Sequence, residues 1–250
     1  MSTPVFAFVS GKGGTAKTTS AFAMGFVLAT NNVRVVFCDL DSTQALTDAA
    51  MTLRDPNVKV PLEVPMKITD DPPISLPTFG ETGAVLLRAA RALATSPMAV
   101  YDARVAQALA AAGPDGVVIV DCPGVLGKEI PAVSRVGAHF VVAVEPRATA
   151  SKKATDLIAV LRQMYSDNPV SVLLTKVGKD KETQGTVAEL TAQVGDLILD
   201  TIIPLDGWVP RAERDRIPVT AGRPSPAYHA YIAATDELLM RASNAMGAVA

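Results

Sequence analysis

The sequence is poor in aromatic residues and in cysteine, and it lacks both a long apolar run and a marked excess of either charge. Only 5% of its 250 residues are aromatic while 49% are hydrophobic, so a core must be built mainly from aliphatic side chains. No apolar run approaches the ~20 residues that a transmembrane helix needs, and no basic segment precedes the short apolar run at the start of the chain. These absences favour a soluble, cytoplasmic protein.

The cysteines and the charges exclude further classes. Cys38 and Cys122 lie far apart and form no CxxC pair, which favours two buried, reduced thiols over a disulfide. Lys and Arg number 23 against 25 Asp and Glu, a formal net charge of −2. That balance excludes a uniformly basic nucleic-acid binder but leaves room for a local basic patch.

Short β-branched runs alternate with longer helical patterns along the chain, as in a parallel sheet flanked by helices. Apolar strands without alternation indicate burial on both faces. The sequence therefore predicts an α/β fold, a doubly wound, mainly parallel sheet flanked by helices, in one domain over residues 1–250. The expected strands are 5–9, 33–38, 117–120, 140–144, 171–175 and 199–203, and the expected helices are 18–29, 149–165, 182–194 and 226–243.

The segment 55–80 departs from this pattern because it holds six prolines and little periodicity. Proline cannot donate a ladder hydrogen bond, so it is confined to edge strands and loops. We expect an irregular excursion of the same domain, with one short edge strand around 58–64.

A glycine-rich loop stands between the first expected strand and the first expected helix. Such a loop directs backbone N–H groups and the positive end of the helix at one spot, which suits phosphate oxygens. Lys17 adds a charge for the β- and γ-phosphates, and the Thr18 hydroxyl is placed to bind Mg²⁺. The predicted nucleotide-binding loop is Gly11, Lys12, Gly13, Gly14, Thr15, Ala16, Lys17, Thr18 and Thr19.

Ala16 stands where the usual phosphate-binding loop has its last glycine. Alanine restricts the backbone if this position needs a positive φ. The sequence thus predicts nucleotide binding but leaves its strength open.

Three aspartates follow two of the expected strands. Asp39 and Asp41 alternate at the end of one strand and so project to one side, and Asp121 ends the strand 117–120. Because ligands of parallel sheets bind beyond the carboxyl ends of the strands, these acids should lie beside the glycine loop. A carboxylate there can hold Mg²⁺ through water, although a strand-end aspartate can equally cap a helix.

Lys12-Gly13-Gly14 ahead of Lys17-Thr18-Thr19 resembles the deviant Walker A motif of the ParA/MinD family of ATPases. The resemblance covers nearly the whole chain and implies a P-loop NTPase fold, ATP and Mg²⁺ as cofactors, and a homodimer with ATP sandwiched between its protomers. Lys12 would reach across the interface to the partner's nucleotide, as an arginine finger does.

The same resemblance implies a role for each site residue. Lys12, Lys17 and Asp41 would be catalytic, with Asp41 positioning the attacking water. Pro204 would border the adenine, while Ser42-Thr43 replaces the Pro-Gln pair of the family. The implied metal-binding residues are Thr18, Asp39 and Asp121.

The chain begins at the first strand, so it is most similar to the small ParA proteins that partition plasmids. This implies ATP-dependent dimerisation, non-specific DNA binding with nucleoid association, and hydrolysis stimulated by a ParB-like centromere-binding partner. The candidate DNA contacts are Lys176, Lys179, Lys181, Arg211, Arg214, Arg216 and Arg223. Because acids lie among them, both stretches could equally be solvated faces of mixed charge.

Three alternatives follow from the same family. A MinD-like membrane switch needs a basic amphipathic C-terminal helix, whereas residues 241–250 carry one charge and no bulky apolar face. An iron–sulfur carrier needs paired cysteines. An ATPase that positions another cargo, such as a protein cluster or division-site factor, would have the same fold and site, and stays open.

Overall fold

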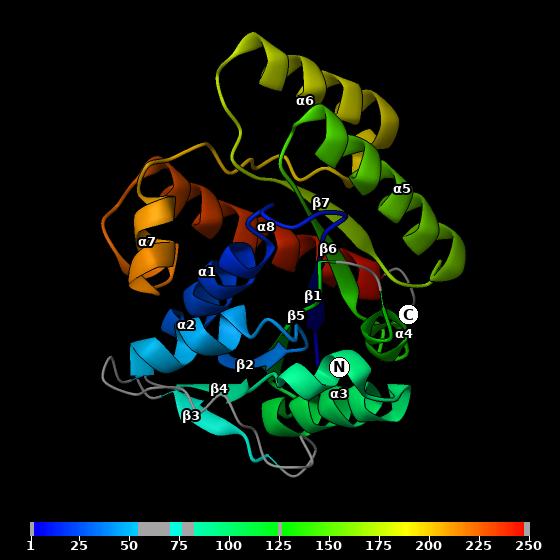
Figure 1. Cartoon of the computed structure of the whole chain (residues 1–250), viewed down its shortest axis with the longest axis vertical. Helices are drawn as coiled ribbons and strands as arrows, with labels where there is room; N and C mark the ends of the chain where they lie inside the picture. The colour runs from blue at the N-terminus through cyan, green and yellow to red at the C-terminus, as the bar shows by residue number, and fades with distance from the viewer. Residues whose placement is uncertain (1–2, 55–70, 77–82, 125–126, 248–250) are drawn as a thin grey trace.

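The computed structural model describes residues 3–54, 71–76, 83–124 and 127–247. They form one seven-stranded sheet in the order β3-β4-β2-β5-β1-β6-β7, in which all neighbours are parallel except β3 and β4 (Figure 1). The predicted doubly wound, mainly parallel α/β fold is confirmed. The strands are β1 (Val5–Val9), β2 (Arg34–Asp39), β3 (Ile74–Leu76), β4 (Ala84–Leu87), β5 (Gly116–Asp121), β6 (His139–Val144) and β7 (Val170–Leu174).

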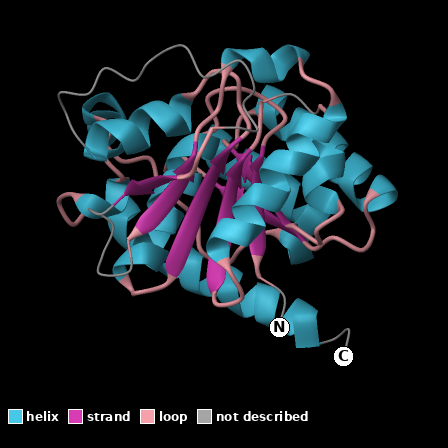
Figure 2. Cartoon of the chain, turned by 90° about the horizontal axis from the view of Figure 1, so that it is seen from below, coloured by secondary structure: helices cyan, strands magenta, loops and turns pink. Residues whose placement is uncertain are grey.

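Helices cover both faces of this sheet (Figure 2). They are α1 (Lys17–Thr30), α2 (Ala45–Arg54), α3 (Met98–Ala112), α4 (Glu129–Ser134), α5 (Ala148–Met164), α6 (Lys181–Val194), α7 (Val209–Asp215) and α8 (Pro226–Gly247), with short 3₁₀ turns at Arg91–Thr95, Gly195–Leu197 and Val219–Ala221. None of the helices in the described residues is both long and apolar enough to cross a membrane.

Two apolar cores lie on opposite faces because successive strand side chains point to opposite sides. Phe6 and Phe8 of β1 pack with α1, α2, α7 and α8. Val5, Ala7 and Val9 of the same strand pack with α3, α4, α5 and α6. The all-apolar strands of the sequence are therefore buried on both sides, as expected.

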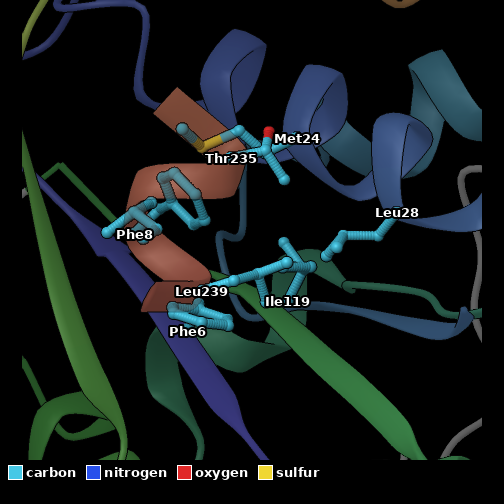
Figure 3. A pocket seen from close by; sticks show the side chains of 8 residues that line it. Phe6, Phe8, Met24, Leu28, Ile119, Thr235 and Leu239 are labelled. Carbon is cyan, nitrogen blue, oxygen red and sulfur yellow. The ribbon is translucent and has the colours of Figure 1, made fainter. Parts of the chain in front are cut away.

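The core against α1 and α8 contains a small apolar crevice (Figure 3). Its volume is about 10 Å³, which is the room of roughly one water molecule. The crevice is a packing gap and no ligand site. Its lining is Phe6, Phe8, Met24, Leu28, Ile119, Thr235, Leu238 and Leu239.

The expected strand at 199–203 is wrong. The segment runs beside β7, to which Leu199 and Ile203 donate their backbone N–H groups. The isolated bridges in this region, Val172 with Ile198 and Val177 with Pro204, involve the residues on either side of the segment. The physical reason is that Glu237 of α8 accepts the backbone N–H groups of Asp200 and Thr201 at 2.8 and 3.0 Å. A ladder therefore cannot continue along the segment.

The edge of the sheet also differs from expectation. The expected edge strand at 58–64 lies outside the described residues, but the segment 55–80 does contain the edge strand β3, antiparallel to β4. The sequence analysis did not identify β4, which pairs with β2 as a parallel strand. Cys38 and Cys122 are both free and fully buried, which confirms the expectation of reduced thiols.

His139 is a buried titratable group at the start of β6. It lies at the amino ends of the parallel strands, whereas Asp39 and Asp121 lie at the carboxyl ends. Its Nε2 lies 2.9 Å from Ser171 Oγ, and its ring lies 5.7 Å from that of Phe6. Burial, together with the charge of Arg241, lowers the pKa of His139 to about 4. The neutral imidazole is therefore the form that fits the fold.

We expect His139 to make the free energy of unfolding fall as the pH drops from 6.5 to 4. In this pH range His139 binds a proton in the unfolded chain but stays neutral in the folded protein. The free energy of unfolding therefore falls by about 3 kcal/mol. The measurement is urea unfolding of the wild type and of His139→Gln at pH 7.5 and 5. The difference in stability between the two proteins should shrink at pH 5, and an unchanged difference would contradict this prediction.

Candidate nucleotide-binding site

The glycine loop joins β1 to α1 in a compact turn. Gly14 has a φ of +83°, which glycine adopts without a steric penalty. A Cβ on Gly11 would lie 2.7 Å from the Lys153 carbonyl oxygen, so only glycine fits against α5 there. Ser10 Oγ donates to the Lys12 carbonyl at 3.0 Å. The turn thereby leaves the first N–H groups of α1 directed into the cleft described below.

Ala16 stands immediately before α1 in the left-handed conformation, with φ 57° and ψ 26°. A residue with a Cβ is disfavoured there because the Cβ crowds the carbonyl oxygen that follows. Ala16 therefore occupies a position with a positive φ, where an alanine strains the loop. Its carbonyl still accepts the N–H of Ser20 at 2.8 Å, so α1 starts normally.

Asp121 binds the two functional side chains that open α1. Its Oδ1 accepts from Lys17 Nζ at 2.5 Å and its Oδ2 from the Thr18 hydroxyl at 2.7 Å. Burial alone would lower the pKa of Lys17, but the Asp121 carboxylate outweighs it and leaves that pKa raised. The predicted grouping of Lys17, Thr18 and Asp121 is thus one hydrogen-bonded cluster of opposite charges.

Asp39 and Asp41 have different surroundings. Asp39 is fully buried, and its two oxygens accept the N–H of Asp41, at 3.0 Å, and both the N–H and the hydroxyl of Thr47, at 2.8 and 2.7 Å. Burial, followed by the nearby charge of Asp121, raises the pKa of Asp39 to about 7. Asp39 therefore fastens the segment between β2 and α2, with its oxygens already occupied.

Asp41 faces the cleft. Its Oδ2 lies 3.8 Å from Lys17 Nζ, and its Oδ1 accepts the N–H of Thr43 at 2.9 Å. This turn leaves the carboxylate at the wall of the cleft. The structure thus brings Asp41 beside Lys17, whereas the side chain of Asp39 is hydrogen-bonded to Thr47 of α2.

A cleft of about 610 Å³ opens over the loop, bounded by Asp41 and Thr43 on one side and by Pro123 and Gly124 on another. A second cavity of about 210 Å³ is lined by Pro204, Val209 and Tyr231 among others. Ala16, Lys176 and Glu213 line both, so the two cavities adjoin. Together they have the size of a small-molecule site, and charged side chains line both of them.

Thr15 provides a test of whether a phosphate fits this cleft. Its hydroxyl is buried in the wall and has no hydrogen-bond partner among the described residues. A buried hydroxyl without a partner is costly, and a phosphate oxygen is an acceptor of the right chemistry. The loop therefore suits a nucleotide phosphate.

A metal ion at this cleft would need ligands from outside the protein. Within the described part of the chain, no group of three His, Cys, Asp or Glu side chains is arranged to hold a metal. Mg²⁺ is usually held by one or two protein groups together with water and nucleotide phosphates. Thr18 and Asp121 offer such a pair.

Two residues that the sequence did not predict at the nucleotide site, Lys176 and Glu213, line the cleft, and Thr175 supports its loop. Thr175 donates to the Thr15 carbonyl at 2.8 Å, and Glu213 accepts from the Thr19 hydroxyl at 2.5 Å. Lys176, a candidate DNA contact, donates to the Gly14 carbonyl at 2.6 Å, and its contact with DNA stays a prediction. The signal that could have found Thr175 and Lys176 is their place directly after β7, at the rim where the other strands end.

The remaining basic candidates lie on two separate elements. Lys179 and Lys181 are exposed at the start of α6, whereas Arg211, Arg214 and Arg216 are exposed on and just after α7. Figure 1 shows these helices apart. Arg214 pairs with Asp215 at 3.0 Å and Arg216 donates to Thr52 at 3.3 Å, while Arg223 is exposed farther along the chain.

Lys12 differs from Lys17 in its surroundings. Its side chain is exposed and does not line the cleft, whereas that of Lys17 is buried in it. One loop therefore presents one lysine inward and another outward.

A strand, a glycine loop and a helix beneath a two-part cleft, with an aspartate on the next strand, define a P-loop nucleotide-binding protein. Residues 6–219 match the CbiA family, described as the CobQ/CobB/MinD/ParA nucleotide-binding domain. The chain belongs to this family. A comparison with curated protein sequences gives no significant match.

Solved structures share the fold at low identity. Apo McdA of Cyanothece has a TM-score of 0.75 and 17% identity, with 95% of this chain and 99% of that chain covered. MinD of Pyrococcus horikoshii complexed with Mg-ADP has 0.73 and 18%, covering 94% and 96%. A Borrelia burgdorferi protein described as a plasmid partition protein, bound to AMPPNP, has 0.73 and 16%, covering 95% and 97%.

Replacing Ala16 by glycine should raise the free energy of unfolding by roughly 0.5–1 kcal/mol, because the strain of the left-handed alanine exceeds the entropy that glycine adds to the unfolded chain. Denaturant unfolding measures this change. Ala188→Gly, at an exposed position inside α6, is the matched control and should destabilise by up to about 1 kcal/mol. A loss of stability in both variants would show that Ala16 is unstrained.

Proposed function

We propose that this chain is a ParA-type ATPase that acts in the partition of plasmid or chromosomal DNA. The observation that carries the proposal is the different placement of the two lysines of the glycine loop. Lys17 is buried in the cleft, and Lys12 is exposed outside it. An outward lysine next to a nucleotide site is available to a second protomer. A homodimer with ATP sandwiched between its subunits would use both lysines.

Within one protomer, the N–H groups of the loop and the Lys17 ammonium would bind the phosphates of ATP. Thr18 and Asp121 would hold Mg²⁺, which when bound would neutralise charge on the phosphates of ATP. Asp41 would orient the attacking water and accept its proton as the water oxygen bonds to the γ-phosphorus. The bond between that phosphorus and the oxygen bridging to the β-phosphate would break, and ADP would leave with that oxygen. Pro204, in the adjoining cavity, would border the adenine.

Asp39 would serve the metal site indirectly. Its contacts with Asp41 and Thr47 fix the backbone that carries Asp41. This segment would keep the Asp41 carboxylate beside Lys17 while ATP is hydrolysed to ADP and phosphate.

DNA binding would depend on dimerisation, because one small basic patch is weak alone and two linked patches gain avidity. Arg211, Arg214 and Arg216 are exposed beside the cleft, since Glu213 of the same helix lines it. Together with Lys179 they are the proposed phosphate contacts. A ParB-like partner would stimulate hydrolysis and release a dimer that is otherwise associated with the nucleoid.

The second candidate is an ATPase of the same kind that positions a protein cargo, such as a protein cluster or a division-site factor. The likeness to McdA and MinD, whose TM-scores match that of the Borrelia protein, supports keeping it. Both candidates share the nucleotide cycle and differ in what the dimer binds.

Non-specific DNA binding should require ATP. We expect binding to a random-sequence duplex with AMPPNP and Mg²⁺, and little with ADP or without nucleotide, as measured by fluorescence anisotropy over a salt series. Arg211→Ala should lower the slope of log K against log salt by about 1 per subunit contact. Arg162→Ala, an exposed arginine on α5, is the control and should leave the slope unchanged. A protein that binds AMPPNP but no DNA would favour the second candidate.

Replacing Lys12 by alanine should leave ATP affinity within about threefold of the wild type but abolish dimerisation with AMPPNP. The removed ammonium would otherwise offset phosphate charge in the partner's site, so stimulated turnover should fall by roughly 10³-fold. Titration calorimetry tests the ATP affinity, light scattering tests dimerisation, and phosphate release with the stimulating partner tests turnover. A Lys12→Ala protein that still dimerises with AMPPNP would contradict the proposal that Lys12 binds the nucleotide of the partner.

A further inference from the structure

The loop after β7 touches the glycine loop through two consecutive side chains. Thr175 donates to the Thr15 carbonyl at 2.8 Å, and Lys176 Nζ donates to the Gly14 carbonyl at 2.6 Å. These partners are about 160 residues apart in the sequence. The side chains after β7 thus bind two successive carbonyl groups of the phosphate-binding turn.

Lys176 holds this contact from a strained backbone. Its φ of 53° lies in the left-handed region, which is disfavoured for a residue with a Cβ. Such conformations persist where the surroundings enforce them, and they cluster at ligand sites. The strain indicates that the position of this ammonium is fixed by the fold.

The ammonium lies where the two parts of the cleft meet. Among the described residues, only Ala16, Lys176 and Glu213 line both cavities, and Lys176 is the cation of the three. The C=O and the N–H of one trans peptide point in opposite directions. An ammonium that holds the Gly14 carbonyl on one side therefore keeps the Thr15 N–H of the same peptide directed to the other side.

We propose that Lys176 is a nucleotide-binding and positioning residue rather than a DNA contact. It holds the Gly14 carbonyl, so the N–H groups that follow it stay directed at the phosphates, and it adds positive charge at the end of the phosphate chain nearer the base. This role rests on the ATP binding proposed above. It separates Lys176 from Lys179, three residues later, whose exposed side chain lines neither cavity.

The test replaces Lys176 by methionine, which keeps the stem and the left-handed backbone and removes the charge. Dissociation constants for ATP and ADP should both rise roughly tenfold, the loss expected for one charge-assisted hydrogen bond. The two losses should be similar because both nucleotides carry the α- and β-phosphates. Lys176→Arg should recover most of the affinity, and Lys179→Met, the matched control, should stay within about twofold of the wild type.

Two further measurements separate this role from a merely structural one. Lys176→Met should raise the KM for ATP by a larger factor than it lowers kcat at saturating ATP, as expected for a residue that binds the substrate and the transition state alike. DNA binding at saturating AMPPNP should be retained. Unchanged ATP and ADP affinity would overturn the proposal, as would a fall in kcat at saturation as large as the rise in KM.

Failure of the partition proposal gives a different result. A wild-type protein that binds ATP but no DNA removes the partition role, while the ratio of the Lys176→Met and wild-type dissociation constants still decides the role of Lys176. A wild-type protein that binds no ATP would overturn both.

Discussion

The buried carboxylate of Asp121 is the group on which the rest of the site depends. It ends the strand between β1 and β2 and takes its two hydrogen bonds from the first two residues of α1. The charge of a fully buried carboxylate is sustained only by such partners. The register of the sheet sets Asp39 opposite it and Phe8 on its other side. The strand pairing that builds the core therefore also fixes the positions of Asp121 and of the side chains that it binds.

Around this cluster, the side chains divide into those that face the nucleotide and those that hold them in place. Lys17, Thr18 and Asp41 line the cleft. Asp39 lies behind Asp41 and is tied to α2 through Thr47, whose hydroxyl also accepts the N–H of Ala89 just after β4. Thr175 and Lys176 hold the glycine loop from the opposite side. The phosphate-binding turn is thus supported from both halves of the sheet.

The sequence predicted those parts whose signal is local. Apolar runs marked β1, β2, β5, β6 and β7, and the glycine loop with its following acids marked the cleft. The segment 199–203 has the composition of a strand, but the N–H groups of Asp200 and Thr201 bind a carboxylate on α8 that no local pattern reveals. Lys176 was grouped with its basic neighbours because its left-handed turn, which carries its ammonium to Gly14, is a property of the fold.

The contact between Glu237 and the segment beside β7 reaches beyond the sheet. Asp200 and Thr201, which Glu237 holds, lead directly into Ile203 and Pro204 at the wall of the smaller cavity. Tyr231 of the same helix forms part of that wall, and its hydroxyl oxygen lies 3.1 Å from Ser20 Oγ of α1. The helix α8 therefore supports the smaller cavity, so a shortened chain that ended before α8 would lose one wall of that cavity.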